Sequence, residues 1–163
     1  MDDAGPALKS VFPFCKGCPA DSNCCTGKTV DLPVLTPKDV GLICRKTGLA
    51  PRQFCLPTRD VLSTMRSRKG VCYFYKQGKC SIYRFRPVDC RLFPFDVHVN
   101  DEGKAVLVLH VNACPQRIDA EAFAGKVWPL VRQIKPYLKE FAEYRSPRSS
   151  RHSYKVFHDY VQV

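Results

Sequence analysis

The sequence predicts an α+β fold: a small, loop-rich cysteine-cluster domain with short strands, one hairpin and a C-terminal amphipathic helix. Three observations lead to this prediction. Ten cysteines stand in a chain of 163 residues, most of them beside glycine, proline or other turn residues. Two alternating apolar segments flank Asp101–Gly103, as in a hairpin. Residues 119–144 then carry apolar side chains at three- and four-residue steps, as in an amphipathic helix.

Residues typical of helix starts and stops border the first predicted helix. Val30–Leu35 reads as a short strand, and Thr36 follows it as a helix N-cap with Pro37 at the first helical position. Gly48 supplies the stop of this helix. The segment after it, residues 50–55, reads as another short helical turn.

The middle of the chain predicts a strand, a turn at Gln77–Gly78 and a further turn ending at Tyr83. A short helix is expected from Pro87 to Pro94. In the long C-terminal helix, prolines at positions 129 and 136 should kink the helix or split it in two.

Four segments are expected along the chain. They are a flexible lead (1–14), the cysteine-cluster domain (15–118), the C-terminal helix packing on it (119–145) and a basic tail (146–163). The last residues of the tail could dock as a final strand or turn.

The first residues are acidic and polar, without the basic and apolar regions of a signal peptide. No apolar stretch is long enough to span a bilayer. We therefore expect a cytoplasmic protein, in which clustered cysteines bind metal more often than they form disulfides.

The formal net charge is +11 with every cysteine counted as neutral. Thiolate ligands would lower it, because metal-bound cysteines are deprotonated. The remaining positive charge suits docking to an acidic surface of a protein partner or larger enzyme complex. Nucleic acid is a weaker candidate, since no stripe of alternating aromatic and basic residues is present.

Eight cysteines form the candidate metal site. The first four form a C-x2-C-x5-C-C pattern in a polar loop, and the other four lie at the edges of predicted elements. They are Cys15, Cys18, Cys24, Cys25, Cys72, Cys80, Cys90 and Cys114. Since two adjacent cysteines cannot easily share one tetrahedral centre with a neighbouring C-x2-C, Cys25 could serve a different centre from Cys24. Cys44 reads as a core residue, and Cys55 as either core or a spare ligand.

Two arginines near Cys90 and two histidines on the predicted hairpin each have a functional and an ordinary interpretation. Arg86 and Arg91 flank Cys90 and could donate hydrogen bonds to cluster sulfurs as cofactor-binding residues, or they could be solvent-facing helix charges. His98 and His110 lie on the predicted hairpin strands, where ordinary sheet surface is the default interpretation.

The segments CKGCPADSNCC, VDLPVLTPKDVGLI, GVCYFYKQGKCSIYRFRPVDCRLFPF and NACP together resemble the YkgJ-type cysteine-cluster family. The resemblance covers about Cys15 to Pro115, and it implies a compact zinc- or iron-chelating module with the same eight cysteines as ligands. Flagellin lysine N-methylase is similar in this region and is associated with an iron–sulfur cluster. This chain shows no sequence for a methyl-donor pocket.

Wide ligand spacing favours iron–sulfur clusters, one or two of the [4Fe–4S] type, over the alternative of Zn²⁺. The first functional hypothesis is an electron-transfer or cluster-bearing accessory subunit of a larger enzyme. The alternatives are a zinc or iron metallochaperone or maturation factor, and a component of a protein lysine methylase. No acid–base pair, nucleophile triad or phosphate loop stands out, so the sequence assigns no catalytic residue and leaves open whether the protein is an enzyme.

Overall fold

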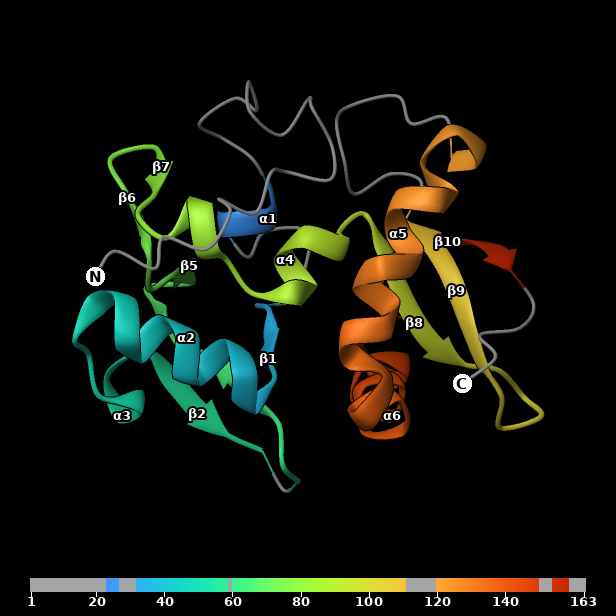
Figure 1. Cartoon of the computed structure of the whole chain (residues 1–163), viewed down its shortest axis with the longest axis horizontal. Helices are drawn as coiled ribbons and strands as arrows, with labels where there is room; N and C mark the ends of the chain where they lie inside the picture. Colours follow the sequence, from blue (N-terminus) through green and yellow to red (C-terminus); the bar gives the residue numbers. More distant parts are fainter. Residues whose placement is uncertain (1–22, 27–31, 59, 111–119, 150–153, 159–163) are drawn as a thin grey trace, which may run out of the picture.

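The computed structural model describes the backbone of residues 23–26, 32–58, 60–110, 120–149 and 154–158, and the side chains of residues 25–26, 32–58, 60–110 and 126–144. The predicted α+β fold is confirmed, with short antiparallel pairs before residue 95 and a longer sheet with two helices after it (Figure 1). No helix within these ranges is long and apolar enough to cross a membrane.

The part of the chain before residue 95 consists of short elements. Its helices are α1 (Asn23–Thr26), α2 (Pro37–Thr47), α3 (Pro51–Phe54) and α4 (Val88–Leu92), with a 3₁₀ turn, η2 (Tyr83–Phe85). Its strands are β1 (Val34–Leu35), β2 (Cys55–Pro57), β3 (Ser63–Met65), β4 (Ser67–Arg68), β5 (Val71–Cys72), β6 (Tyr75–Lys76) and β7 (Lys79–Cys80). They form a sheet in the order β1–β3–β2 and two separate hairpins, β4–β5 and β6–β7.

Helix α2 begins and ends at the predicted residues. The Thr36 hydroxyl accepts a hydrogen bond from the Asp39 amide at 3.2 Å, and the Asp39 carboxylate accepts one from the Thr36 amide at 3.0 Å. This reciprocal capping box satisfies amides that the first turn would leave unpaired. At the other end, Gly48 has a φ of 72° and its amide bonds to the Cys44 carbonyl. A left-handed glycine at this position is a common helix stop.

Other local predictions are confirmed in part. Strand β1 is shorter than the predicted Val30–Leu35 strand, of which residues 30 and 31 lie outside the described ranges. The turn between β6 and β7 lies where it was expected, with φ values of 49° at Gln77 and 74° at Gly78. Helix α4 starts directly after Pro87, as expected for a proline at a helix start.

The last third of the chain is built on the predicted hairpin, which is confirmed. Strands β8 (Phe95–Val99) and β9 (Ala105–His110) pair antiparallel, and β10 (Tyr154–His158) pairs with the other edge of β9. Of the two forms expected for the last residues, strand or turn, the strand is found over the part that the structure describes, and residues 159–163 lie outside the described ranges. Helix α6 (Leu138–Ser149) packs against β8 and β9 (Figure 1).

The predicted C-terminal helix is split once. Helix α5 (Ala120–Ile134) continues through Pro129, and the 3₁₀ turn η3 (Lys135–Tyr137) separates it from α6. Pro136 stands in the first turn of η3, where a missing amide hydrogen costs little. The expected break is thus found at the second proline, while the first lies inside a helix.

Two apolar clusters form the described core. The first joins the odd-numbered residues of the β8–β9 sheet to α4, α5 and α6; its members include Phe95, Leu107, Leu92, Ile134 and Phe141. The second lies among the short elements and is built around Leu35, Ile43, Phe54, Met65, Phe74 and Ile82. Helix α4 lies at the junction, because its apolar side chains belong to the first cluster and its cysteine faces residues near the second.

Candidate metal centre

Two of the predicted ligands lie on the short hairpins. Cys72 ends β5 and pairs with Ser67 of β4, while Cys80 ends β7 and pairs with Tyr75 of β6. Phe74, between the two hairpins, is 3% exposed. This buried aromatic side chain fixes the connection between the segments that carry the two cysteines.

Backbone amides approach both of these sulfurs. Burial raises the pKa of Cys72, and a hydrogen bond from the Phe74 amide is the largest opposing effect. Burial likewise raises the pKa of Cys80, with the Ile82 amide as the largest opposing effect. In both cases the donor stands two residues after the cysteine. Hydrogen bonds of this kind favour the thiolate and adjust the potential of an iron–sulfur cluster.

The described candidate ligands meet at Cys90, the third residue of α4. Burial raises the pKa of Cys90 well above its usual value, and the charges of Asp89, Cys72, Cys25 and Cys80 raise it further, in that order. Such charge effects fall off with distance, so these groups lie near the Cys90 sulfur. Four neighbouring thiols oppose one another's ionisation, and a bound cation would remove this repulsion.

Cys25 comes to this site from the first cysteine motif. It is half-buried on α1, and α1 contacts β5, the strand that ends in Cys72. The side chain of Cys24 is not described, and three other predicted ligands lie outside the described residues: Cys15, Cys18 and Cys114. The structure thus brings together four of the eight candidate cysteines, and the metal-ligating role of all eight stays a prediction.

No three of these four sulfurs all lie within 4.8 Å of one another. Among the described His, Cys, Asp and Glu residues, the one group of three whose ligand atoms all lie within 4.8 Å of one another contains no cysteine. Four thiolates bound to one tetrahedral zinc at about 2.3 Å would lie only about 3.8 Å apart.

The conserved-domain comparison agrees with this chemistry. Residues 14–115 match the model of the CxxCxxCC family, described as a "Putative zinc- or iron-chelating domain". The chain belongs to this family. The matched range is more than half of the chain and contains all eight candidate cysteines. No curated protein and no solved structure matched. The chain is therefore a cysteine-rich zinc- or iron-chelating domain of the CxxCxxCC type.

In this CxxCxxCC domain, two buried carboxylates hold the helix that carries Cys90. The Asp89 carboxylate accepts a hydrogen bond from the Val34 amide of β1 at 2.7 Å. The Asp39 carboxylate, on α2, accepts one from the Val88 amide at the start of α4 at 3.1 Å. Both bonds join segments about fifty residues apart in the sequence, so they position α4 on the first half of the domain.

A buried arginine ties the same helix to the last third of the chain. Arg91 donates to the Gln133 side chain of α5 at 2.7 Å. Burial lowers the pKa of Arg91, and the charge of Asp39 opposes this. Burial raises the pKa of Asp39, against hydrogen bonds from Thr36 and the charge of Arg91. The charges of Asp39 and Arg91 therefore each favour the ionised form of the other, against the effect of burial.

The two arginines predicted to bind the cofactor are both buried, at 7% exposure each. The alternative that they face the solvent is therefore wrong. The Arg86 guanidinium lies 4.1 Å from the centre of the Tyr83 ring, and its charge partly offsets the burial that raises the pKa of Cys80. The charge of Cys90 acts to raise the pKa of Arg91, against the larger effect of burial. Hydrogen bonding from these arginines to a cluster remains a prediction that their position supports.

The two remaining cysteines lie apart from this site. Cys55 is 5% exposed in the second apolar cluster, and its thiol donates to the Pro51 carbonyl at 3.1 Å. Cys44 packs against the same cluster and lies close enough for its charge to raise the pKa of Cys55. The charge of neither residue contributes to the pKa shift of Cys90. The structure supports core roles for both.

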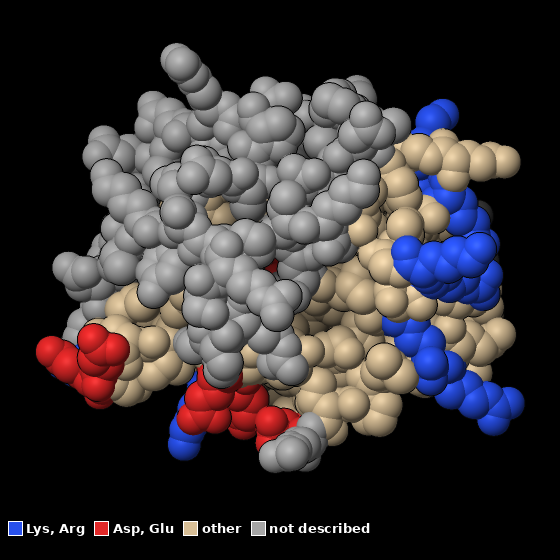
Figure 2. Space-filling model, turned by 180° about the vertical axis from the view of Figure 1, so that it is seen from behind, with Lys and Arg blue, Asp and Glu red and all other residues tan. Residues whose placement is uncertain are grey.

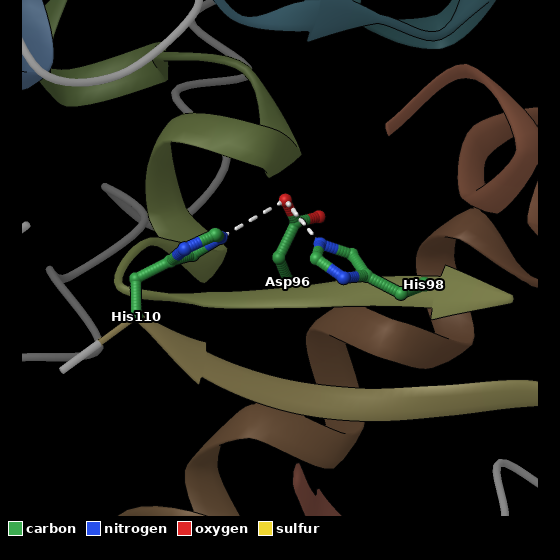
Figure 3. A group of neighbouring side chains, drawn as sticks. All are labelled: Asp96, His98 and His110. Carbon is green, nitrogen blue, oxygen red and sulfur yellow. Dashed lines mark hydrogen bonds and ion pairs between the residues drawn. The ribbon is translucent and has the colours of Figure 1, made fainter. Parts of the chain in front are cut away.

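A group of buried polar residues on the β8–β9 hairpin was not predicted from the sequence. His98 and His110 were expected on the sheet surface, but they are 3% and 6% exposed. Both approach the buried carboxylate of Asp96 (Figure 3). The signal that could have found them is Asp-x-His on one strand, with a histidine near the end of the facing strand.

Proposed function

We propose that the cysteines hold one or two [4Fe–4S] clusters, and that the chain acts as an electron-transfer or cluster-bearing accessory subunit of a larger enzyme. The observation that carries this proposal is the gathering of Cys25, Cys72 and Cys80 around Cys90, with no three of the four sulfurs all within 4.8 Å of one another. In a four-iron cluster each thiolate binds a different iron, so the sulfurs are held further apart.

The surroundings of the sulfurs also favour a cluster. Amide hydrogens at Cys72 and Cys80, together with the buried charges of Arg86 and Arg91, stabilise electron density on sulfur. Structural zinc sites commonly use two tight pairs of cysteines two to four residues apart. Among the eight candidate ligands, only Cys15 and Cys18 form a pair with this spacing.

Under this proposal each of the two clusters takes ligands both from the C-x2-C-x5-C-C pattern and from the four later cysteines. Cys25 joins Cys72, Cys80 and Cys90 in one cluster, which agrees with the expectation that it serves a different centre from Cys24. The remaining ligands, Cys15, Cys18, Cys24 and Cys114, would hold a second cluster.

A basic side of the molecule supports docking to an acidic protein partner. Figure 2 shows described Lys and Arg side chains gathered on the side of α2 and α3, while Asp and Glu gather toward the β8–β9 turn and α6. The exposed basic residues between 32 and 86 are Lys38, Arg45, Lys46, Arg52, Arg68, Lys69, Lys76, Lys79 and Arg84. Complementary charge of this kind accelerates the encounter of redox partners.

The metallochaperone alternative is less well supported. It rested on surplus cysteines available for metal transfer, and both surplus residues, Cys44 and Cys55, pack in the second apolar cluster. The methylase alternative rests on the family resemblance alone.

The deciding experiment measures iron, zinc and acid-labile sulfide per chain in protein purified without oxygen, with visible absorption spectra before and after dithionite. We expect about four irons and as many sulfides per cluster, with an absorption that bleaches on reduction. Zinc without sulfide or colour would exclude the redox function and favour a structural or chaperone module.

A further inference from the structure

Three buried polar side chains share one face of the β8–β9 hairpin. Asp96, His98 and His110 are 4%, 3% and 6% exposed. Side chains alternate across a strand, so these three point opposite to Phe95 and Leu107, which pack on the helices. Buried ionisable groups are costly unless they are paired or bind a metal.

The strand register brings the three side chains together. Asp96 pairs with Val108, so His110, two residues further along β9, is its diagonal neighbour on the same face. His98 follows Asp96 by two residues on β8. Figure 3 shows the carboxylate between the two imidazoles. Their ligand atoms all lie within 4.8 Å of one another.

The two nitrogen–oxygen distances match those between neighbouring ligands of one metal ion, and the His110 contact is also a long hydrogen bond to Asp96. His98 Nε2 lies 3.5 Å from Asp96 Oδ2, and His110 Nε2 lies 3.4 Å from the same oxygen. Imidazolium–carboxylate hydrogen bonds are shorter, at about 2.7–2.9 Å. Ligands at about 2.1 Å from a tetrahedral zinc ion lie about 3.4 Å apart. An octahedral ion with similar bond lengths would bring neighbouring ligands to about 3.0 Å.

We propose that Asp96, His98 and His110 bind one Zn²⁺ ion, at a site distinct from the cysteine centre. Two imidazoles and one carboxylate are common ligands of zinc, whereas Mg²⁺ and Ca²⁺ prefer oxygen ligands throughout. The Asp96 carboxylate is fixed by its other oxygen, which accepts a hydrogen bond from the Val97 amide at 2.8 Å. The β8–β9 pairing extends over five residue pairs, whereas the hairpins that carry Cys72 and Cys80 have two each. The longer pairing holds the backbone of these three ligands more rigidly.

The test titrates the full chain, with its cysteine centre loaded, with Zn²⁺ and counts zinc per chain after removal of free metal. The variants are Asp96→Asn and His98→Ala. The control is Glu102→Gln, which makes the same chemical change as Asp96→Asn at an exposed position of the same hairpin. Wild type and control should bind one zinc more than either variant. The variants should lose more than about 100-fold in affinity, because losing an outer partner of a ligand alone costs about 10–100-fold.

X-ray absorption at the zinc edge of the wild-type protein gives a second readout that requires no variant to fold. The added zinc should show nitrogen and oxygen neighbours at about 2.0–2.1 Å and no sulfur at about 2.3 Å. Sulfur neighbours would place the zinc at the cysteines and overturn the proposal. Equal zinc content in wild type and Asp96→Asn would also overturn it, leaving a hydrogen-bonded triad without metal.

Discussion

At the level of single side chains, the cysteines fall into two kinds according to what surrounds their sulfurs. Cys25, Cys72, Cys80 and Cys90 lie near one another's charges, whereas Cys55 bonds to a backbone carbonyl in an apolar cluster. A thiol of the first kind gains from metal binding because the cation offsets mutual repulsion. A thiol of the second kind packs as a small apolar residue.

This difference predicts opposite effects of serine substitutions. Cys25→Ser and Cys90→Ser should each remove the iron and sulfide of one centre, about four of each for a [4Fe–4S] cluster. Cys44→Ser, outside the site, should leave both contents unchanged. Iron and sulfide analysis of the three purified variants provides the measurement. Full iron content in Cys25→Ser would mean that this residue is not a ligand.

Asp89 anchors the helix of Cys90 through one short bond to the Val34 amide. In Asp89→Ala that amide loses its partner in a buried setting, and we expect the free energy of unfolding to fall by about 1–3 kcal/mol. Asp101→Ala, at an exposed turn, is the matched control and should change stability by less than about 0.5 kcal/mol. Urea unfolding of the metal-loaded proteins compares them. Equal losses in both variants would argue against the anchoring role.

The sequence identifies the cysteines but not the residues that arrange them. Asp39 and Asp89 look like ordinary acidic residues of helix starts, and their long-range bonds to Val88 and Val34 depend on the tertiary fold. His98 and His110 were assigned to a solvated sheet face because alternation shows which residues share a face. It does not show whether that face is buried.

At the level of elements, the most predictable segments are those whose signals are local. Helix α2 carries its cap, its first-turn proline and its glycine stop within thirteen residues of sequence, from Thr36 to Gly48. The β8–β9 hairpin likewise has its turn between alternating segments. Less predictable were the lengths of β1 and of the hairpins around Cys72 and Cys80, because strands of two residues have no periodicity to detect.

The cap of α2 gives a test at this scale. Thr36→Ala removes the hydroxyl that accepts from the Asp39 amide and also donates to the Asp39 carboxylate at 2.8 Å. Stability should fall by about 1 kcal/mol, the usual cost of losing an N-cap. Thr36→Ser retains the hydroxyl and should remain close to wild type. Thermal or urea unfolding distinguishes the two, and an equal loss in both would point to the methyl group instead of the cap.

At the level of the whole molecule, the two apolar clusters differ in how much regular structure supports them. The sheet of β8, β9 and β10 packs with α5 and α6 around one continuous cluster. The other cluster is surrounded by strands of two or three residues, and isolated two-stranded hairpins are at best marginally stable in water. We therefore expect the stability of the first part of the domain to depend more on bound metal than that of the last part.

Metal removal should accordingly loosen one region more than the other. In hydrogen exchange of the full chain, loss of metal should raise exchange in residues 63–92 and leave residues 95–110 nearly unchanged, because binding energy stabilises the segments that supply the ligands. Exchange in helix α4 should rise together with that of residues 63–87, because Cys90 lies near the other three thiols. We expect this although Val88 and Leu92 pack in the apolar cluster of the β8–β9 sheet. An apo-protein with the same cooperative melt and the same exchange pattern as the loaded form would show that the fold does not depend on the metal.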